Sequence, residues 1–135
     1  MEDSLLVCKE FEIFKIEYWM ENRYSFGKNR RITEKEEIRR VLLKGFFYPG
    51  NYLQIHYLPE AEKRFSIRLL QGIKGGYKRN KLRRLLREIT RIAAPLLKDG
   101  LYIVEGKKMA LNISYNKLKE DFNKVCLEGN LWQNS

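Results

Sequence analysis

The chain has 135 residues, 44% of them hydrophobic and 13% aromatic, which suits one compact domain with a packed core and excludes a disordered basic tail. Its formal net charge is +10, but residues 1–22 hold two basic and six acidic residues, so residues 23–135 carry +14 and favour a polyanionic partner. Two distant cysteines and one histidine argue against a disulfide framework or a zinc site, and without a secretory signal or an apolar run of ~18 residues we expect a cytoplasmic protein.

Residues 1–22 are predicted to form an acidic N-terminal extension, and residues 23–135 a single RNA-binding α+β domain. Within the extension, FEIFKIEYW (residues 11–19) alternates apolar and charged side chains, as an extra strand would. Such a strand could pair with a sheet edge or mask a basic surface. Met20 would also make a plausible start, so residues 1–19 could equally be absent from the natural protein.

The domain is predicted to open with a helix over EKEEIRRVLLKG, residues 34–45. Thr33 would cap this helix, Glu36 would complete a capping box, and Gly45 would end it. Three apolar residues would form its buried side, namely Ile38, Val41 and Leu42.

Two amphipathic strands follow, NYLQIHYL (51–58) and RFSIRLL (64–70), and the PEAEK connection between them predicts a hairpin. One face of this hairpin would pack on the core through Leu53, Ile55, Tyr57, Phe65, Ile67 and Leu69. The other face would be open to solvent. It would carry side chains that can form hydrogen bonds, namely Gln54, His56, Ser66 and Arg68.

A glycine-rich turn, QGIKGGYK, leads into a basic helix that Pro95 should bend or end. LYIVEG, residues 101–106, predicts a third strand. Ser114 would cap a last helix that ends near Gly129, with an apolar stripe of Leu118, Phe122 and Val125. The order αββαβα predicts an α+β two-layer sandwich.

The basic helix lies in KGGYKRNKLRRLLREITRI, residues 74–92, which hold eight Lys or Arg and one acid. Its apolar residues keep helical spacing, while Arg79, Arg83 and Arg87 follow one another at i+4 steps along another side. Six cations fall within residues 78–87, about 14 Å of helix at 1.5 Å per residue. Such a row can meet several phosphates, which guanidinium groups bind with two hydrogen bonds. An ordinary solvated helix face is the alternative.

The acidic residues indicate no catalytic site in the protein. The candidate carboxylate pairs are Glu36–Glu37, Glu60/Glu62 and Glu120–Asp121. Each pair has basic neighbours, as solvated surfaces do, and adjacent residues on a helix face different ways. The single histidine, His56, has no plausible Ser or Cys partner for a nucleophilic triad. We therefore expect neither catalytic nor metal-binding residues here.

The segment YKRNKLRRLLREI resembles the RNR signature of the bacterial ribonuclease P protein subunit, RNRxKRxxRE. Its signature positions are occupied by Arg79, Asn80, Arg83, Arg84, Arg87 and Glu88, with Lys81 in place of the second Arg. YSFGKNRRITEKEEIRRVLLKG and NYLQIHYL are similar to the family's opening and first strand, so the resemblance covers about residues 24–126. Two features depart from the family: Gln71 and Gly72 replace the paired lysines of its SKKxGNAV run, and LYIVEGKK lacks the usual flanking Asp and Arg.

The resemblance implies the ribonuclease P protein fold, which is ribosomal S5 domain 2-like. It also implies the role of a non-catalytic protein subunit in a ribonucleoprotein endonuclease. In that enzyme the RNA subunit removes the 5′ leader of precursor tRNA with Mg2+, which is bound mainly through the RNA, and the protein assists. The implied partners are ribonuclease P RNA and precursor tRNA, with no membrane and no obligatory protein partner.

By position, the residues implied to contact the catalytic RNA are Lys74, Lys78, Arg79, Asn80, Lys81, Arg83, Arg84 and Arg87. A cleft between the first helix and the open sheet face would bind the leader through Ile38, Leu42, Gln54, His56, Ser66 and Arg68. Ile38 and Leu42 stand where the family usually has aromatic residues, and His56 where it commonly has Tyr. Leader binding should therefore depend less on base stacking and more on charge and hydrogen bonds.

Two other functions fit the same residues. A general structured-RNA-binding or ribosome-associated module would use the same basic helix without a role in tRNA maturation. A protein-interaction or membrane-surface module is also compatible with an amphipathic basic helix. Membrane insertion, however, usually needs Trp or Phe on the apolar side, which residues 82–92 lack.

Overall fold

The computed structural model of the protein describes residues 31–70 and 76–133. Its elements in chain order are α2 (Lys35–Lys44), β1 (Phe46–Pro49), β2 (Leu53–Leu58), β3 (Arg64–Leu69), α3 (Gly76–Ala93), β4 (Leu101–Gly106) and α4 (Tyr115–Glu128), with short 3-10 helices at Ala94–Leu96 and Lys108–Ala110. The predicted α+β class is confirmed, and the order αβββαβα adds one strand, β1, to the predicted elements. The predicted acidic extension over residues 1–22, its strand and Lys74 lie outside the described residues.

The strands form one mixed sheet in the order β1-β2-β4-β3. Strand β2 pairs antiparallel with β1 and β4, whereas β3 pairs parallel with β4. The predicted hairpin of β2 and β3 is therefore wrong, because β4 lies between these two strands. Parallel strands need a long crossover connection, and α3 supplies it between β3 and β4.

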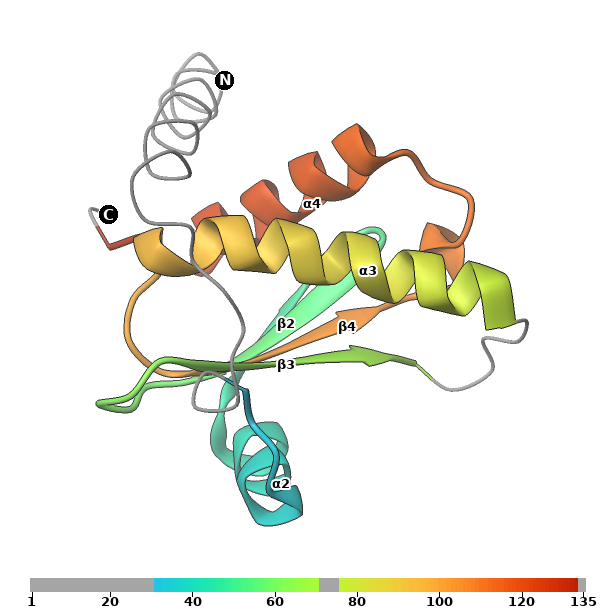
Figure 1. The fold of residues 1–135 in the computed structure, drawn as a ribbon. Helices are drawn as coiled ribbons and strands as arrows, with labels where there is room; N and C mark the ends of the chain where they lie inside the picture. Colours follow the sequence, from blue (N-terminus) through green and yellow to red (C-terminus); the bar gives the residue numbers. More distant parts are fainter. Residues whose placement is uncertain (1–30, 71–75, 134–135) are drawn as a thin grey trace.

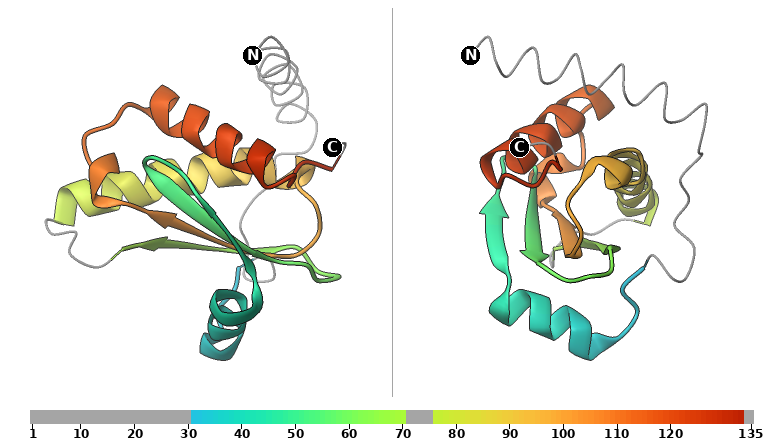
Figure 2. Two further views of the ribbon diagram at one scale, coloured as in Figure 1. Left: turned by 180° about the vertical axis from the view of Figure 1, so that it is seen from behind. Right: turned by 90° about the vertical axis from the view of Figure 1, so that its left-hand side faces the viewer.

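Helices cover the two faces of the sheet unequally. Figure 1 and Figure 2 show α3 and α4 side by side over one face and α2 against the other face at one end. The larger core lies under α3 and α4, and a smaller cluster under α2 contains Ile32, Val41, Leu101 and Ile103. All six residues of β4 are buried because successive side chains alternate between these two clusters.

Helix α2 differs from the prediction at its start. Glu34 is the N-cap residue and makes no side-chain capping bond, so the predicted capping box of Thr33 and Glu36 is wrong. The chain is still attached to the sheet just before the helix, since the N–H of Ile32 donates to the carbonyl of Phe65 at 2.9 Å. The predicted end is confirmed: Gly45 follows the last turn, and its N–H donates to the carbonyl of Val41.

The predicted buried side of α2 is only partly correct. Val41 is fully buried, Ile38 is partly buried against the smaller cluster, and Leu42 is 38% exposed. The reason is that α2 covers only one end of the sheet. An ion pair adds a second attachment, because both guanidinium Nη atoms of Arg64 in β3 donate to the carboxylate of Glu37.

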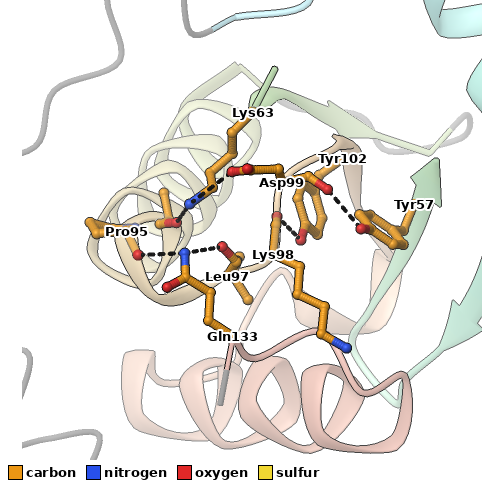
Figure 3. A network of polar contacts seen from close by, with 9 residues as sticks. Tyr57, Lys63, Pro95, Leu97, Lys98, Asp99, Tyr102 and Gln133 are labelled. Carbon is orange, nitrogen blue, oxygen red and sulfur yellow. Dashed lines mark hydrogen bonds and ion pairs between the residues drawn. The ribbon is translucent and has the colours of Figure 1, made fainter. Parts of the chain in front are cut away.

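The C-terminal end of α3 is held by a network of polar contacts (Figure 3). As predicted, the helix ends before Pro95, which lies in the following 3-10 turn. The Nζ of Lys63 donates to the carbonyl of Ala94 at 2.9 Å, and burial lowers the pKa of this amine. The Nε2 of Gln133 donates to the carbonyl of Leu97 at 2.8 Å. A cation beside the last carbonyls of a helix complements the helix dipole. The contact of Lys63 with the carbonyl of Ala94 therefore stabilises the C-terminal end of α3.

Helix α4 has the predicted limits. The hydroxyl of Ser114 caps it by accepting from the N–H of Lys117, and it ends before Gly129. Its predicted apolar stripe is buried. The buried carboxylate of Asp121 accepts three backbone N–H bonds from the turn between β1 and β2, at 3.0, 2.8 and 3.1 Å from Asn51, Tyr52 and Leu53. Asp121, one of the acids considered above for catalysis, thus fixes the position of strand β2.

We predict that Asp121→Ala lowers the free energy of unfolding by roughly 2–4 kcal/mol, because three backbone donors lose their acceptor in a buried place. Denaturation by urea measures this change. Glu120→Ala removes the neighbouring, exposed carboxylate and should change stability by less than about 0.5 kcal/mol. Equal stability of the two variants would contradict the role assigned to Asp121.

Candidate nucleic-acid interface

Helix α3 carries two distinct sides. Its buried residues include Leu82, Leu86 and Ile89, which pack in the larger core. The opposite side is solvated and is called the basic surface below. It consists of Lys78, Asn80, Lys81, Arg84 and Arg87, which are exposed, and Arg79 and Arg83, which are partly exposed.

Most cations of the basic surface have no acidic partner among the residues that the structure describes. The acid within the helix, Glu88, pairs with Arg91, whose Nε donates to it at 3.1 Å. Within residues 31–70 and 76–133, no carboxylate forms an ion pair with Lys78, Lys81, Arg83, Arg84 or Arg87. Like charges held this close repel one another, and a polyanion would relieve that repulsion.

The sheet face toward α2 brings together four predicted side chains. In the strand register, Gln54 of β2 and Arg68 of β3 both lie opposite Glu105 of the central strand. His56 and Ser66 both lie opposite Ile103, two residues earlier on the same strand. The alternation in each strand correctly assigned Gln54, His56, Ser66 and Arg68 to one face, although their strands are not direct neighbours. These side chains and the two described next, Phe47 and Glu105, are called the sheet-face cluster.

Glu105 is a member of this cluster that the sequence reasoning missed. It is only 6% exposed, and its Oε1 accepts from the Nε2 of Gln54 at 2.8 Å and contacts the Nε2 of His56 at 2.6 Å. The Nη1 of Arg68 lies 4.0 Å from Oε2. A buried carboxylate is costly unless it is paired and hydrogen-bonded, as this one is. The sequence did contain a signal for this position. In LYIVEG, Glu105 follows Leu101 and Ile103 at two-residue steps, so all three side chains point to the same face of the strand.

Phe47 is the second residue that was missed, because no element was predicted between Gly45 and the strand at residues 51–58, where β1 lies. It lies opposite His56 in the register and is 49% exposed. The centres of the two rings are 4.9 Å apart, with an angle of 35° between their planes. Phe46, the residue before it, points to the other face of the same edge strand and is 56% exposed. An exposed aromatic ring therefore lies beside the predicted hydrogen-bonding side chains.

The remaining predicted residues on this side lie on α2. Ile38 packs against the smaller cluster, and Leu42 is partly exposed. Both side chains are aliphatic, so neither can join the hydrogen bonds of the sheet-face cluster.

The carboxylates considered for catalysis are engaged elsewhere. Glu37 and Glu62 both pair with Arg64, the latter at 3.4 Å, and Glu60 pairs with Arg40 at 2.7 Å. In the described part of the chain, no group of three His, Cys, Asp or Glu side chains is arranged to hold a metal ion. None of the described helices is both long and apolar enough to cross a lipid bilayer.

Comparison with solved structures identifies the fold. The Staphylococcus aureus ribonuclease P protein superimposes with a TM-score of 0.71 at 16% identity, covering 78% of this chain and 100% of that one. The Thermotoga maritima ribonuclease P protein superimposes with a TM-score of 0.63 at 18% identity, covering 70% and 93%. At these identities the likeness supports the fold alone.

Comparison of sequences identifies the family. The ribonuclease P protein component of Dictyoglomus turgidum is 32% identical over 107 residues, covering 76% of this chain and 90% of that protein. That of Borrelia duttonii is 33% identical over 98 residues, covering 68% and 84%. The family model described as Ribonuclease P matches residues 26–129, which include the sheet, the basic helix and α4. The chain therefore belongs to the bacterial ribonuclease P protein family, as a distant member.

Proposed function

We propose that this ribonuclease P protein component binds the catalytic RNA through the basic surface of α3 and the 5′ leader of precursor tRNA on the sheet face toward α2. In this role it assists the Mg2+-dependent, RNA-catalysed endonucleolytic maturation of tRNA 5′ ends. The observation that carries the proposal is the basic surface itself. Five of its cations have no carboxylate partner among the described residues, and they project from a helix whose other side is buried in the core.

The basic surface suits a folded RNA because its cations are held in a fixed relation to one another. Packing of Leu82, Leu86 and Ile89 fixes one side of the helix, and Lys63 and Gln133 hold the chain at its C-terminal end. A preorganised row of guanidinium groups binds phosphates with less loss of conformational entropy than a flexible basic tail. Lys74, in the segment before the helix, would extend the same contact.

The sheet face suits a single strand for a different reason. Its groups combine a positive charge, hydrogen-bond donors and acceptors, and a polar hydroxyl, in Arg68, Gln54, His56 and Ser66. The side chain of Arg68 is 43% exposed and can reach a phosphate. Leu42 on α2 offers apolar contact at the side of this face, while Ile38 would act mainly by supporting α2.

Magnesium ions would be bound mainly through the RNA. Mg2+ binds to oxygen ligands in octahedral geometry, usually through carboxylates together with water and phosphate. Here Glu37, Glu60 and Glu62 are neutralised by arginines, and Asp121 accepts backbone N–H groups. These carboxylates therefore do not fit a magnesium site, and we assign no step of the reaction to the protein.

A general structured-RNA-binding module is the alternative, since the basic surface alone would bind many folded RNAs. Reconstitution with the candidate catalytic RNA of the same organism distinguishes the two. We predict that the protein increases processing of precursor tRNA at low magnesium concentration and binds the precursor more tightly than leaderless tRNA in the holoenzyme. Processing that does not depend on the protein, together with equal binding of both tRNAs, would favour the alternative.

We predict that affinity for the catalytic RNA falls steeply with salt. Each phosphate neutralised adds about 0.7–0.9 to the slope of log affinity against log salt concentration, because bound cations displace counterions. Filter binding at a series of KCl concentrations measures this slope. A slope near zero would show that phosphate contacts do not dominate the complex.

We predict that Arg83→Ala combined with Arg87→Ala weakens binding to the catalytic RNA at least about tenfold at moderate salt, and reduces the salt slope by about 1.5. The matched control is Lys117→Ala with Lys124→Ala, which removes the same charge from exposed positions on α4. Thermal unfolding should be nearly unchanged in both, since all four side chains lie outside the core. Equal affinity of the two double variants would remove Arg83 and Arg87 from the interface.

A further inference from the structure

We propose that Phe47 and His56 form a stacking site for one unpaired base of the leader, and that Glu105 is a positioning residue for this site. This inference rests on the proposed function and deepens it. It assigns the site to residues of strands β1, β2 and β4, and not to helix α2, where the resemblance implied the leader-contacting positions Ile38 and Leu42.

The first step is the position of Phe47. Its ring is half exposed on the same sheet face as Gln54 and His56, and it contacts the imidazole of His56 with a ring separation of 4.9 Å. Proteins that bind single-stranded RNA stack bases on exposed aromatic rings that lie beside hydrogen-bonding groups. Since Ile38 and Leu42 are aliphatic, Phe47 supplies on the edge strand the aromatic surface that α2 lacks.

The second step is the direction in which the hydrogen-bonding groups are held. A carboxylate accepts hydrogen bonds and cannot donate them. Gln54 must therefore turn its NH2 group toward Glu105, and the Nε2 of His56 must carry a hydrogen. The Oε1 of Gln54 and the Nδ1 of His56 have no partner among the described residues. Both atoms are thus left for the edge of a base.

The third step concerns charge, because a carboxylate on an RNA-binding face would repel phosphate. Glu105 is only 6% exposed and is covered by its contacts to Gln54 and His56. The more exposed charge on this face is Arg68, on the far side of Glu105 from β1. Strands β1 and β3 are three inter-strand spacings apart, about 14 Å. A base at Phe47 and a phosphate at Arg68 would therefore place the leader across the strands, with the carboxylate beneath it.

The stacking site is tested with Phe47→Ala and the matched control Phe46→Ala, which removes the neighbouring exposed ring from the opposite face. Affinities of the reconstituted holoenzyme are measured for precursor tRNA with a leader and for leaderless tRNA. We expect Phe47→Ala to weaken binding of the precursor roughly 5- to 100-fold and to leave the leaderless tRNA unchanged. Phe46→Ala should change neither affinity.

An equal loss in both phenylalanine variants, or an equal loss for both tRNAs in Phe47→Ala, would overturn the stacking site while leaving the proposed function intact. A wild-type holoenzyme that does not discriminate between the two tRNAs would overturn both. The leaderless tRNA also controls for folding, because a misfolded protein would lose affinity for both ligands.

The positioning role is tested by coupling between Glu105→Gln and His56→Ala. The amide keeps the size of the side chain and an acceptor oxygen, but it removes the negative charge that strengthens the contacts of Oε1 to both neighbours. We expect each single variant to reduce the preference for the leader several-fold, and the double variant to lose no more than the larger single effect. Independent, multiplicative effects would overturn the role of Glu105. Should Glu105→Gln prevent folding, Gln54→Ala tests the same network, and an undiminished leader preference in that variant would equally overturn it.

Discussion

The packing of helix α3 against strand β4 is the contact on which the rest of the structure depends. Strands β3 and β4 are parallel, so the chain must cross the sheet between them, and α3 is that crossover. Leu86 lies so close to the sheet that a Cβ at Gly106 would be 2.8 Å from its Cδ1. The same contact that closes the core therefore sets the orientation of the helix, and with it the direction in which the arginines project.

A second constraint follows from the position of β4 at the centre of the sheet. A central strand with helices on both faces must bury side chains on both, yet α2 covers only one end of the second face. Beyond α2, no other helix of the described residues covers that face, and there the strands carry polar and aromatic side chains in place of aliphatic ones. Glu105 is tolerated at this point because Gln54 and His56, from the adjacent strand, supply its hydrogen bonds. The structure thus separates the basic surface on α3 from the mixed polar and aromatic side chains of the sheet-face cluster.

The chain keeps the family fold at low sequence identity to its known relatives. Solved ribonuclease P proteins share the fold at 16–18% identity, which the apolar stripes and the parallel crossover are enough to maintain. The curated relatives share 24–33% identity, and the basic helix lies within the segment that the family model matches. The sheet-face cluster lies within the same matched segment.

The sequence by itself determined the fold class, the basic helix and the last helix with its Ser114 cap and Gly129 stop, because helical spacing and caps are local properties. It also assigned Gln54, His56, Ser66 and Arg68 to one face, since alternation along a strand is local too. Only the tertiary structure decided that β4 lies between β2 and β3, because strand order depends on contacts between residues far apart in the chain. Only the tertiary structure decided that Glu105 joins Gln54 and His56, and that Phe47 lies beside them, because the register of neighbouring strands cannot be obtained from any one strand alone.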